Sequence, residues 1–277
     1  MAAVVTLLTD FGMRDEYAGV MKGVILSRCP GALIVDISHS IAPQDIQGAA
    51  LMLEAAYGYF PEGSIHVVVV DPGVGTPRDI IFAQVGGHRF LAPDNGVLTA
   101  VLGHHPPRCV RRITRTDLFL PGAAFHTFHG RDRFSPVASF LAGGGEADRL
   151  GPESDCRDLV RIRLPAPVET ADGLIMGEVT GIDRFGNLIT NIPWRMVSTP
   201  AGDPCRYAVV SIGDGRREIR GISKTYGSVA SGEWVAVVGS RGMIELAVNG
   251  ASAADLSGAA LGDPVCVRCR QSGGSAP

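Results

Sequence analysis

An acid and an arginine follow a run of four valines in the stretch "VVVVDPGVGTPR", residues 67–78. Asp71 comes directly after the valines, and Arg78 comes after a loop that contains two glycines. The loop lacks the lysine and the serine or threonine that a P-loop places after its glycines, so a phosphate site is not indicated. A carboxylate and a guanidinium at this spacing could instead form an ion pair beside a small pocket. A structural turn capped by the acid, with a solvent-facing arginine, fits the same residues.

Two histidines stand in the stretch "FHTFHGRDRFSP", residues 125–136, which leads into an apolar helical pattern. His129, together with a carboxylate, could act as a general base or orient another group. A zinc site is not favoured, because His126 and His129 are too few ligands for that metal. A polar loop that caps a helix is the alternative interpretation of this stretch.

Two stretches of the C-terminal half combine polar groups that could bind a small molecule. "GIDRFGNLITNIP", residues 181–193, contains an acid, an aromatic residue and two asparagines. "GSRGMIELAVNGASA", residues 239–253, places Ser240 and Arg241 after an apolar strand. An asparagine amide can pair with an adenine edge, and an arginine can bind a carboxylate through two bonds. Each stretch alone could equally be a turn in a β domain.

Strand and helix patterns alternate through the first half of the chain. This alternation predicts a parallel sheet that is covered on both faces, with ligands bound beyond the carboxyl ends of its strands. Asp10, Asp36 and Asp71 stand at or near such ends. The expected strands cover 4–10, 33–38 and 65–71, and the expected helices cover 16–29, 43–60 and part of 133–144. Residues 80–102 are expected to form two strands around a Gly-Gly turn, then a loop "APDNG" and a short helix.

The pattern changes near residues 164–173, "LPAPVETADG", after which short strands follow one another with turn residues between them. Such a series is typical of a small β-barrel or sandwich. We therefore predict an α/β N-terminal domain with a mostly parallel sheet, residues 1–164, and a smaller all-β, barrel-like C-terminal domain, residues 173–270.

The composition narrows the class of protein. The 277 residues carry a net charge of −3. In the densest basic stretch, "RCVRRITR", arginines alternate with apolar residues, as expected for a strand with one solvent-exposed face. Nucleic acid is therefore not an expected partner. No apolar run approaches the length of a membrane span and no basic segment opens the chain, so we expect a cytoplasmic protein without a membrane partner. Cys266 and Cys269 form a lone C-x-x-C pair, which is weak support for zinc, and we expect reduced structural cysteines.

Several long motifs, taken in order, resemble the S-adenosyl-L-methionine hydroxide adenosyltransferases, a family related to fluorinases and chlorinases. The motifs that carry the resemblance are "LLTDFGMRDEYAGVMKGV", "IVDISHSIAPQDIQGAA", "FPEGSIHVVVVDPGVGTPR", "APDNGVLT", "FHGRDRFSPVA", "GIDRFGNLITNI" and "SRGMIELAVNGASA". The resemblance implies hydrolysis of S-adenosyl-L-methionine to adenosine and L-methionine, with no metal and no cofactor. It also implies a homotrimer whose active sites lie between the N-terminal domain of one subunit and the C-terminal domain of its neighbour.

The resemblance assigns water activation to Asp71, Arg78 and His129. Halogenating relatives carry a tyrosine at the position of Asp71 and a serine near Gly130. A carboxylate would repel a halide and orient a water, so hydrolysis is favoured over adenosyl halogenation. A third alternative is a sensor that binds S-adenosylmethionine or adenosine without turnover.

Eight further residues are assigned to substrate binding by the same resemblance. They are Asp10 for the ribose hydroxyls, Asp183 and Ser240 with Arg241 for the methionine amine and carboxylate, Asn187 and the backbone around Asn249 for adenine, and Tyr226 and Phe185 for stacking. Two positions depart from the fluorinase pattern, because Gln44 and Val248 replace a tryptophan and an arginine.

Overall fold

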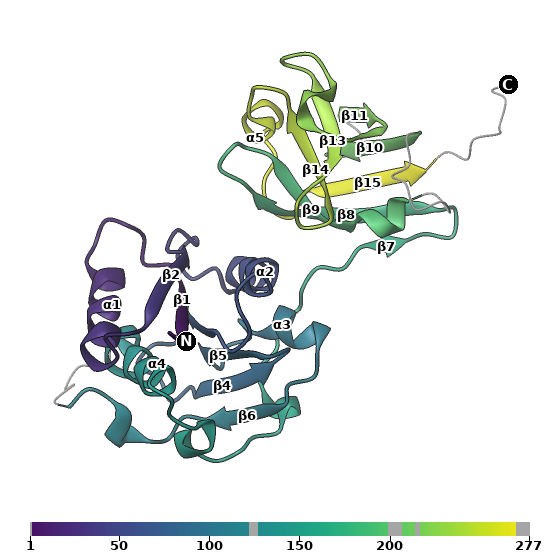
Figure 1. The fold of residues 1–277 in the computed structure, drawn as a ribbon. Helices are drawn as coiled ribbons and strands as arrows, with labels where there is room; N and C mark the ends of the chain where they lie inside the picture. Colours follow the sequence, from purple (N-terminus) through teal and green to yellow (C-terminus); the bar gives the residue numbers. More distant parts are fainter. Residues whose placement is uncertain (1, 122–126, 199–206, 214–216, 270–277) are drawn as a thin grey trace, which may run out of the picture. The chain divides into compact units, whose positions relative to one another are not determined.

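The computed structural model describes residues 2–121, 127–198, 207–213 and 217–269. The chain divides into two compact units, Met1–Leu164 and Pro165–Pro277, and each is described by itself (Figure 1). His126 and Cys205 lie outside the described residues.

The first unit is built on one six-stranded sheet with the order β2-β1-β3-β5-β4-β6. Its strands are β1 Val4–Thr9, β2 Leu33–Ser38, β3 Ile65–Val69, β4 Ile80–Val85, β5 His88–Pro93 and β6 Cys109–Arg112. Its α-helices are α1 Tyr17–Arg28, α2 Ile46–Tyr57, α3 Thr99–His104 and α4 Ser135–Ala142. Short helical turns cover Thr116–Leu118 (η1), Gly130–Phe134 (η2), Ala147–Leu150 (η3) and Cys156–Asp158 (η4).

This sheet is mixed, so the expectation of a mostly parallel sheet is only partly confirmed. β1 pairs in parallel with β2 and β3, and β3 pairs in parallel with β5. β4 instead pairs antiparallel with both β5 and β6. Gly86 and Gly87 join β4 to β5 with φ values of +54° and +83°. Two left-handed residues in sequence make a tight hairpin turn, which forces its two strands to run antiparallel.

The four valines at 67–70 supply two separate cores. Val67 and Val69 pack in a core with Met21 of α1 and with residues of α4. Val68 and Val70 pack in a second core with Leu53 of α2 and with residues of α3. Because side chains alternate along a strand, a strand that is covered by helices on both faces is largely apolar. The valine run is therefore explained by its central place in the sheet.

Helix α2 begins where the sequence supplies a capping acid. The Asp45 carboxylate accepts a hydrogen bond from the backbone N–H of Gly48 at 2.8 Å. A Cβ atom at Gly48 would lie 2.1 Å from that carboxylate, so a side chain at this position would displace the capping acid. A side chain that satisfies a free N–H of the first turn typically stabilises a helix by about 1 kcal/mol.

The second unit is a curled sheet with the order β11-β10-β15-β8-β9-β14-β13-β12, and β7 pairs with β8. β11 also contacts β13, near the opposite end of this order, so the sheet is nearly closed and barrel-like. Its strands are β7 Val168–Glu169, β8 Leu174–Ile182, β9 Leu188–Pro193, β10 Ala208–Ile212, β11 Arg217–Arg220, β12 Ile222–Ser223, β13 Trp234–Val238, β14 Met243–Val248 and β15 Pro264–Cys269. Its helical segments are η5 Trp194–Val197, η6 Tyr226–Ser228 and α5 Ala253–Ser257.

The C-x-x-C pair lies on strand β15, between β10 and β8. Cys266 faces Ser211 and Met176 in the pairing register, and Cys269 faces Ala208. Residues three apart on a strand project to opposite faces of the sheet. The two sulfurs therefore cannot bind one metal ion or form a disulfide with each other.

No helix within the described residues is long and apolar enough to cross a membrane.

Candidate active site

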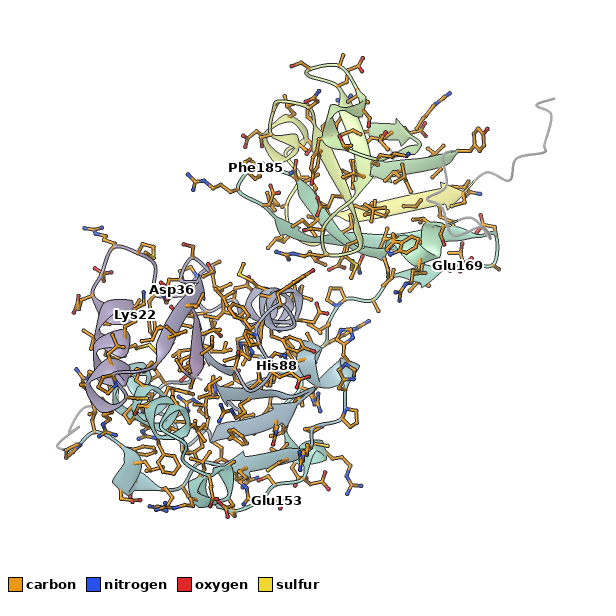
Figure 2. All side chains as sticks on the ribbon, in the orientation of Figure 1. Lys22, Asp36, His88, Glu153, Glu169 and Phe185 are labelled. Carbon is orange, nitrogen blue, oxygen red and sulfur yellow. The ribbon has the colours of Figure 1, made fainter. Side chains whose placement is uncertain are left out.

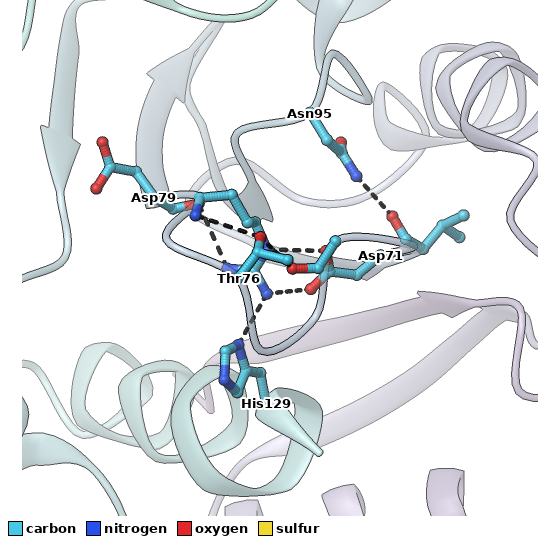
Figure 3. Close-up of polar contacts among 8 residues, drawn as sticks. Asp71, Thr76, Asp79, Asn95 and His129 are labelled. Carbon is cyan, nitrogen blue, oxygen red and sulfur yellow. Dashed lines mark hydrogen bonds and ion pairs between the residues drawn. The ribbon is translucent and has the colours of Figure 1, made fainter. Parts of the chain in front are cut away.

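Asp71 and Arg78 form a buried ion pair at the carboxyl end of β3. A turn beyond the strand, held by the hydrogen bond from Val74 N to the Asp71 carbonyl at 3.1 Å, reverses the chain. Arg78 Nε then donates to Asp71 Oδ1 at 2.8 Å, and Nη2 donates to Oδ2 (Figure 3). The two side chains are 4% and 10% exposed. Two parallel bonds from a guanidinium fix both the position and the plane of a carboxylate.

His129 joins the same cluster through the arginine. Arg78 Nη2 lies 2.9 Å from His129 Nδ1. A guanidinium can only donate, so Nδ1 must offer its lone pair, and a neutral ring then carries its proton on Nε2. His129 is 2% exposed and directly precedes the π-helical turn η2, a kind of distortion that is frequent at functional sites. The structure thus brings together the three residues expected to activate water.

Asn95 fixes the end of strand β3 from a neighbouring loop. Its Nδ2 donates to the carbonyl of Val70 at 2.9 Å (Figure 3). Its Oδ1 accepts from the backbone N–H of Val97 at 3.2 Å. Val70 immediately precedes Asp71, so this amide holds the peptide that carries the acid. The role of Asn95 was not predicted, although the motif "APDNGVLT" contains this residue.

A cavity of about 490 Å³ lies beside the Asp71 cluster in the first unit. Asp10, Asp71 and His129 all line it. The other residues that line it are Phe11, Tyr17, Pro43, Gln44, Val69, Pro72, Val74, Thr127, Phe128 and Gly130. The structure therefore places the carboxylate expected at the ribose and two of the groups expected at the water on one cavity.

The Asp10 carboxylate is oriented by an unusual backbone. Its Oδ2 accepts a hydrogen bond from the backbone N–H of Gln44 at 2.8 Å. Gln44 has a φ of +67°, in a region that side chains other than glycine rarely adopt. Local strain of this kind persists where surrounding contacts hold it and is frequent at functional sites. The sequence marked Gln44 only as a departure from the fluorinase pattern, and its backbone contact to Asp10 was not predicted.

One wall of the cavity is aromatic and leaves little space at Gly130. The rings of Phe11, Tyr17 and Phe128 contact one another with centroids 5.1 to 5.7 Å apart. A Cβ atom at Gly130 would lie 3.0 Å from the sulfur of Met21 and from a ring carbon of Phe128. A serine at this position would therefore require these neighbours to move.

Asp36 does not belong to this cavity, although the sequence suggested that it lies at the same sheet edge. The residue lies within β2 and is 3.1 Å from His39 Nε2 and 2.5 Å from Lys22 Nζ (Figure 2). β2 continues to Ser38, so Asp36 stands before the end of its strand. The ion pair with Lys22 of α1 compensates the negative charge of the Asp36 carboxylate.

The second unit has a cavity of its own, with a volume of about 650 Å³. Phe185, Asn187 and Tyr226 line it, together with Val248, Gly250, Ala251 and Ser252. Phe185, in the loop between β8 and β9, is 76% exposed, so its ring remains accessible (Figure 2). Three of the groups expected at adenine therefore share one cavity.

Asp183 organises the loop that carries Phe185 and Asn187. Its Oδ1 accepts hydrogen bonds from the backbone N–H groups of both residues at 2.8 and 2.9 Å. Its Oδ2 accepts from Asn187 Nδ2 at 2.9 Å. Asn187 thus already uses one amide donor within the loop, and the Asp183 carboxylate has a structural role there.

Ser240, Arg241 and Asn249, which were also expected to bind the substrate, are not among the residues that line this cavity. Ser240 and Arg241 are exposed in the turn between β13 and β14. Asn249 Nδ2 donates to the carbonyl of Val229 at 2.8 Å, and the adjoining residues Val248 and Gly250 line the cavity. The position of Asn249 is thus compatible with the expected contribution of its surrounding backbone.

Comparisons with known proteins identify the family. Residues 5–151 match the SAM hydroxide adenosyltransferase N-terminal domain, and residues 177–266 match the C-terminal domain. The chain is 40% identical over 267 residues to "(R)-S-adenosyl-L-methionine hydrolase" of Thermus thermophilus, covering 94% of this chain and 98% of that protein. It is 28% identical over 213 residues to "Fluorinase" of an Actinoplanes species, covering 68% and 71% of the two chains.

A solved structure agrees with this assignment. The crystal structure of an uncharacterized conserved protein from Thermotoga maritima superposes with a TM-score of 0.87 and 36% sequence identity, over 96% of this chain and all of that one. Both domain families are matched in order and over more than half of the chain. This protein is a member of the SAM hydroxide adenosyltransferase family.

Proposed function

We propose that this protein hydrolyses S-adenosyl-L-methionine to adenosine and L-methionine. The observation that carries the proposal is the buried cluster of Asp71, Arg78 and His129 on a cavity that Asp10 also lines. Relatives named (R)-S-adenosyl-L-methionine hydrolase cover nearly the whole chain, which supports the same substrate and reaction.

The reaction balances with water as the only second reactant. The water oxygen forms a bond to C5′ of the substrate, and the C5′–S bond breaks with its electron pair retained by sulfur. Methionine leaves as a neutral thioether, so the leaving group needs no proton. The water releases one proton, which carries the single positive charge that the sulfonium had before the reaction. The total charge is therefore conserved. Catalysis therefore depends on placing and activating the water.

The cluster has the groups for that task. Asp71 accepts a hydrogen bond from the water and orients its lone pair toward C5′. Arg78 holds the carboxylate in one plane and stabilises the negative charge that develops. His129, whose Nδ1 accepts from Arg78, holds this guanidinium in place, and Asp71 takes the departing proton. Asp10, oriented by the backbone of Gln44, binds the ribose hydroxyls and fixes C5′ for in-line attack.

The barrel unit supplies the complementary half of the substrate site in this proposal. Tyr226 and Phe185 stack on adenine, and Asn187 with the backbone near Asn249 contacts its edge. Asp183 and Ser240, assisted by Arg241, bind the methionine amine and carboxylate. We propose a homotrimer in which this set completes the site of a neighbouring subunit, as the family resemblance implies.

Halogenation is disfavoured by two positions. The Asp71 carboxylate would repel a halide, and Gly130 lacks the serine hydroxyl that halogenating relatives carry near this position. The reaction should therefore be independent of halide.

The direct test incubates the purified protein with S-adenosyl-L-methionine, with and without chloride, and follows products by chromatography. We expect adenosine and methionine in equal amounts at the same rate in both conditions. Consumption that requires chloride would identify a halogenase. Intact substrate, with a raised melting temperature in its presence, would identify a sensor and contradict hydrolysis.

A further inference from the structure

A buried carboxylate, Glu245, stands in the middle of the apolar strand β14. It is 5% exposed and pairs in register with Val237 of β13 and Ile189 of β9. A buried acid is unfavourable unless polar partners compensate for the water that it loses. The contacts of the two Glu245 carboxylate oxygens therefore indicate the role of this residue.

One carboxylate oxygen holds the ring of Tyr226. Tyr226 Oη donates to Glu245 Oε2 at 2.7 Å. The backbone of the Tyr226 turn is held separately, because Thr225 Oγ1 accepts from Gly227 N at 3.1 Å and Ser228 Oγ accepts from Thr225 N at 3.4 Å. The ring, which lines the barrel cavity and is 41% exposed, is thus fixed at both ends.

The Tyr226 hydroxyl keeps its proton over the ordinary pH range. Burial, and then the hydrogen bond to Glu245, raise the pKa of Tyr226 to about 12. The phenol therefore remains a donor, and the bond to Glu245 persists wherever the enzyme would work.

The other carboxylate oxygen supports the turn that carries Ser240 and Arg241. A Cβ atom at Gly239 would lie 1.8 Å from Glu245 Oε1, so the turn rests directly on this side chain. Gly239 N donates to the Met243 carbonyl, and Gly242 N donates to the Gly239 carbonyl, both at 2.9 Å. A side chain at position 239 would therefore require the Glu245 carboxylate to move.

We infer that Glu245 is a positioning residue for substrate binding, which fixes the Tyr226 ring and the turn of residues 239–242 relative to each other. The inference rests on the proposed function for the identity of the ligand. It joins two segments that the sequence treated as separate binding elements, the aromatic residue for adenine and the turn for the methionine end. Glu245 acts through these segments and needs no contact with the substrate.

The test compares Glu245→Met, Glu245→Gln and Tyr226→Phe with the unchanged protein. Methionine removes the acceptor at similar length, glutamine keeps an acceptor, and phenylalanine keeps the ring without its hydroxyl. Glu218→Met is the matched control, since this exposed carboxylate lies on β11 of the same barrel. The measurements are KM and kcat for S-adenosyl-L-methionine, the Kd for adenosine by calorimetry, and the melting temperature.

We expect Glu245→Met and Tyr226→Phe each to raise KM and the adenosine Kd about tenfold, the scale of one hydrogen bond to a charged group. The value of kcat should stay within about twofold, because the water-activating cluster is in the other unit. Glu245→Gln should restore most of the affinity. The double variant should be no weaker than either single variant, because both remove one shared interaction.

An unchanged KM and Kd in Glu245→Met and Tyr226→Phe would overturn the inference, as would effects that add in the double variant. A lower melting temperature without a change in KM or Kd would show a purely structural role and would also overturn it. If the unchanged protein produces no adenosine, the proposed function fails instead, and the adenosine Kd values alone then decide the role of Glu245.

Discussion

Arg78 has the central position among the water-activating residues, because it bonds to both of the others. Its guanidinium fixes the Asp71 carboxylate and at the same time determines which nitrogen of His129 carries a lone pair. Each of the three side chains is therefore held in one orientation by the protein itself. Such preorganisation reduces the reorganisation that must accompany attack by a weak nucleophile such as water.

Replacement of Asp71 by Asn should lower kcat by about a hundredfold or more, a loss typical of a general base, while KM changes little. The amide cannot accept both Arg78 donors and has no negative charge to orient the water. Asp79→Asn is the matched control, because Asp79 is 42% exposed and pairs with Arg112. Steady-state kinetics on the two variants check this expectation, and equal kcat values would exclude Asp71 from catalysis.

Gly130→Ser should destabilise the protein by about 1 kcal/mol, the low end for overpacking a core position, because its neighbours have to shift slightly. The new side chain would press on Met21 and Phe128. Urea unfolding measures the change, with Gly103→Ser as the control, since a Cβ at Gly103 meets nothing within 4 Å. A Gly130→Ser protein as stable as its control would show that the aromatic wall is free to move.

At the scale of elements, strand β3 connects the core to the chemistry. Its valines alternate between two helix layers, and its carboxyl end delivers Asp71 to the cavity. Asn95 holds that end by its bond to Val70. The same part of the sheet contains a buried pair of histidines, in which His66 Nε2 lies 3.1 Å from His88 Nδ1.

The histidine pair should make stability depend on pH. Burial, with a smaller effect of His88, lowers the pKa of His66 to about 3. Below pH 6.5 the unfolded chain binds a proton that the folded protein excludes, so stability falls as pH falls. His66 alone should contribute a loss of about 2 kcal/mol between pH 7.5 and pH 5. His88, whose pKa is also lowered by burial, adds to the slope.

Urea unfolding of the unchanged protein and of His66→Phe at several pH values would measure this contribution. The variant replaces the ring with one that does not titrate, among the aromatic neighbours Tyr57, Phe60 and Phe90. We expect a smaller slope in the variant below pH 6.5. Parallel slopes would show that His66 is protonated in the folded state without penalty.

Much of the secondary structure could be predicted from sequence, because its causes are local. Helices expected at 16–29 and 43–60 are present as α1 and α2, and the strand expected at 33–38 is β2. The sheet was less predictable, since the pairing of β4 with β6 depends on tertiary contacts. The role of Glu245 and the backbone contact of Gln44 to Asp10 were missed for the same reason. A buried partner for Tyr226 and a strained backbone beside Asp10 follow only from the folded positions of distant segments.

At the scale of the whole molecule, the candidate binding groups are divided between two compact units. Asp10, Asp71 and His129 line a cavity of the first unit, and Phe185, Asn187 and Tyr226 line a cavity of the second. One substrate must reach both sets if the proposed function holds. The proposed homotrimer would satisfy this requirement by sharing each site between two subunits.

Subunit mixing should therefore restore activity to inactive variants. Asp71→Asn and Asp183→Asn impair different halves of the site, so trimers reassembled from equal amounts should regain about a quarter of the sites. Light scattering should also give three times the chain mass of 29.1 kDa. A site made within one chain would give no recovery after mixing, and a monomeric mass would rule out sharing.

The most direct measurement of the central claim is the origin of the new oxygen atom in the product. The protein is incubated with S-adenosyl-L-methionine in water enriched in the heavy oxygen isotope, and adenosine is analysed by mass spectrometry. We expect one heavy oxygen at C5′ of adenosine and none in methionine, since water attacks C5′ while the methionine carboxylate does not react. Adenosine without the heavy isotope, or a halogenated nucleoside in its place, would contradict hydrolysis by a water bound at Asp71.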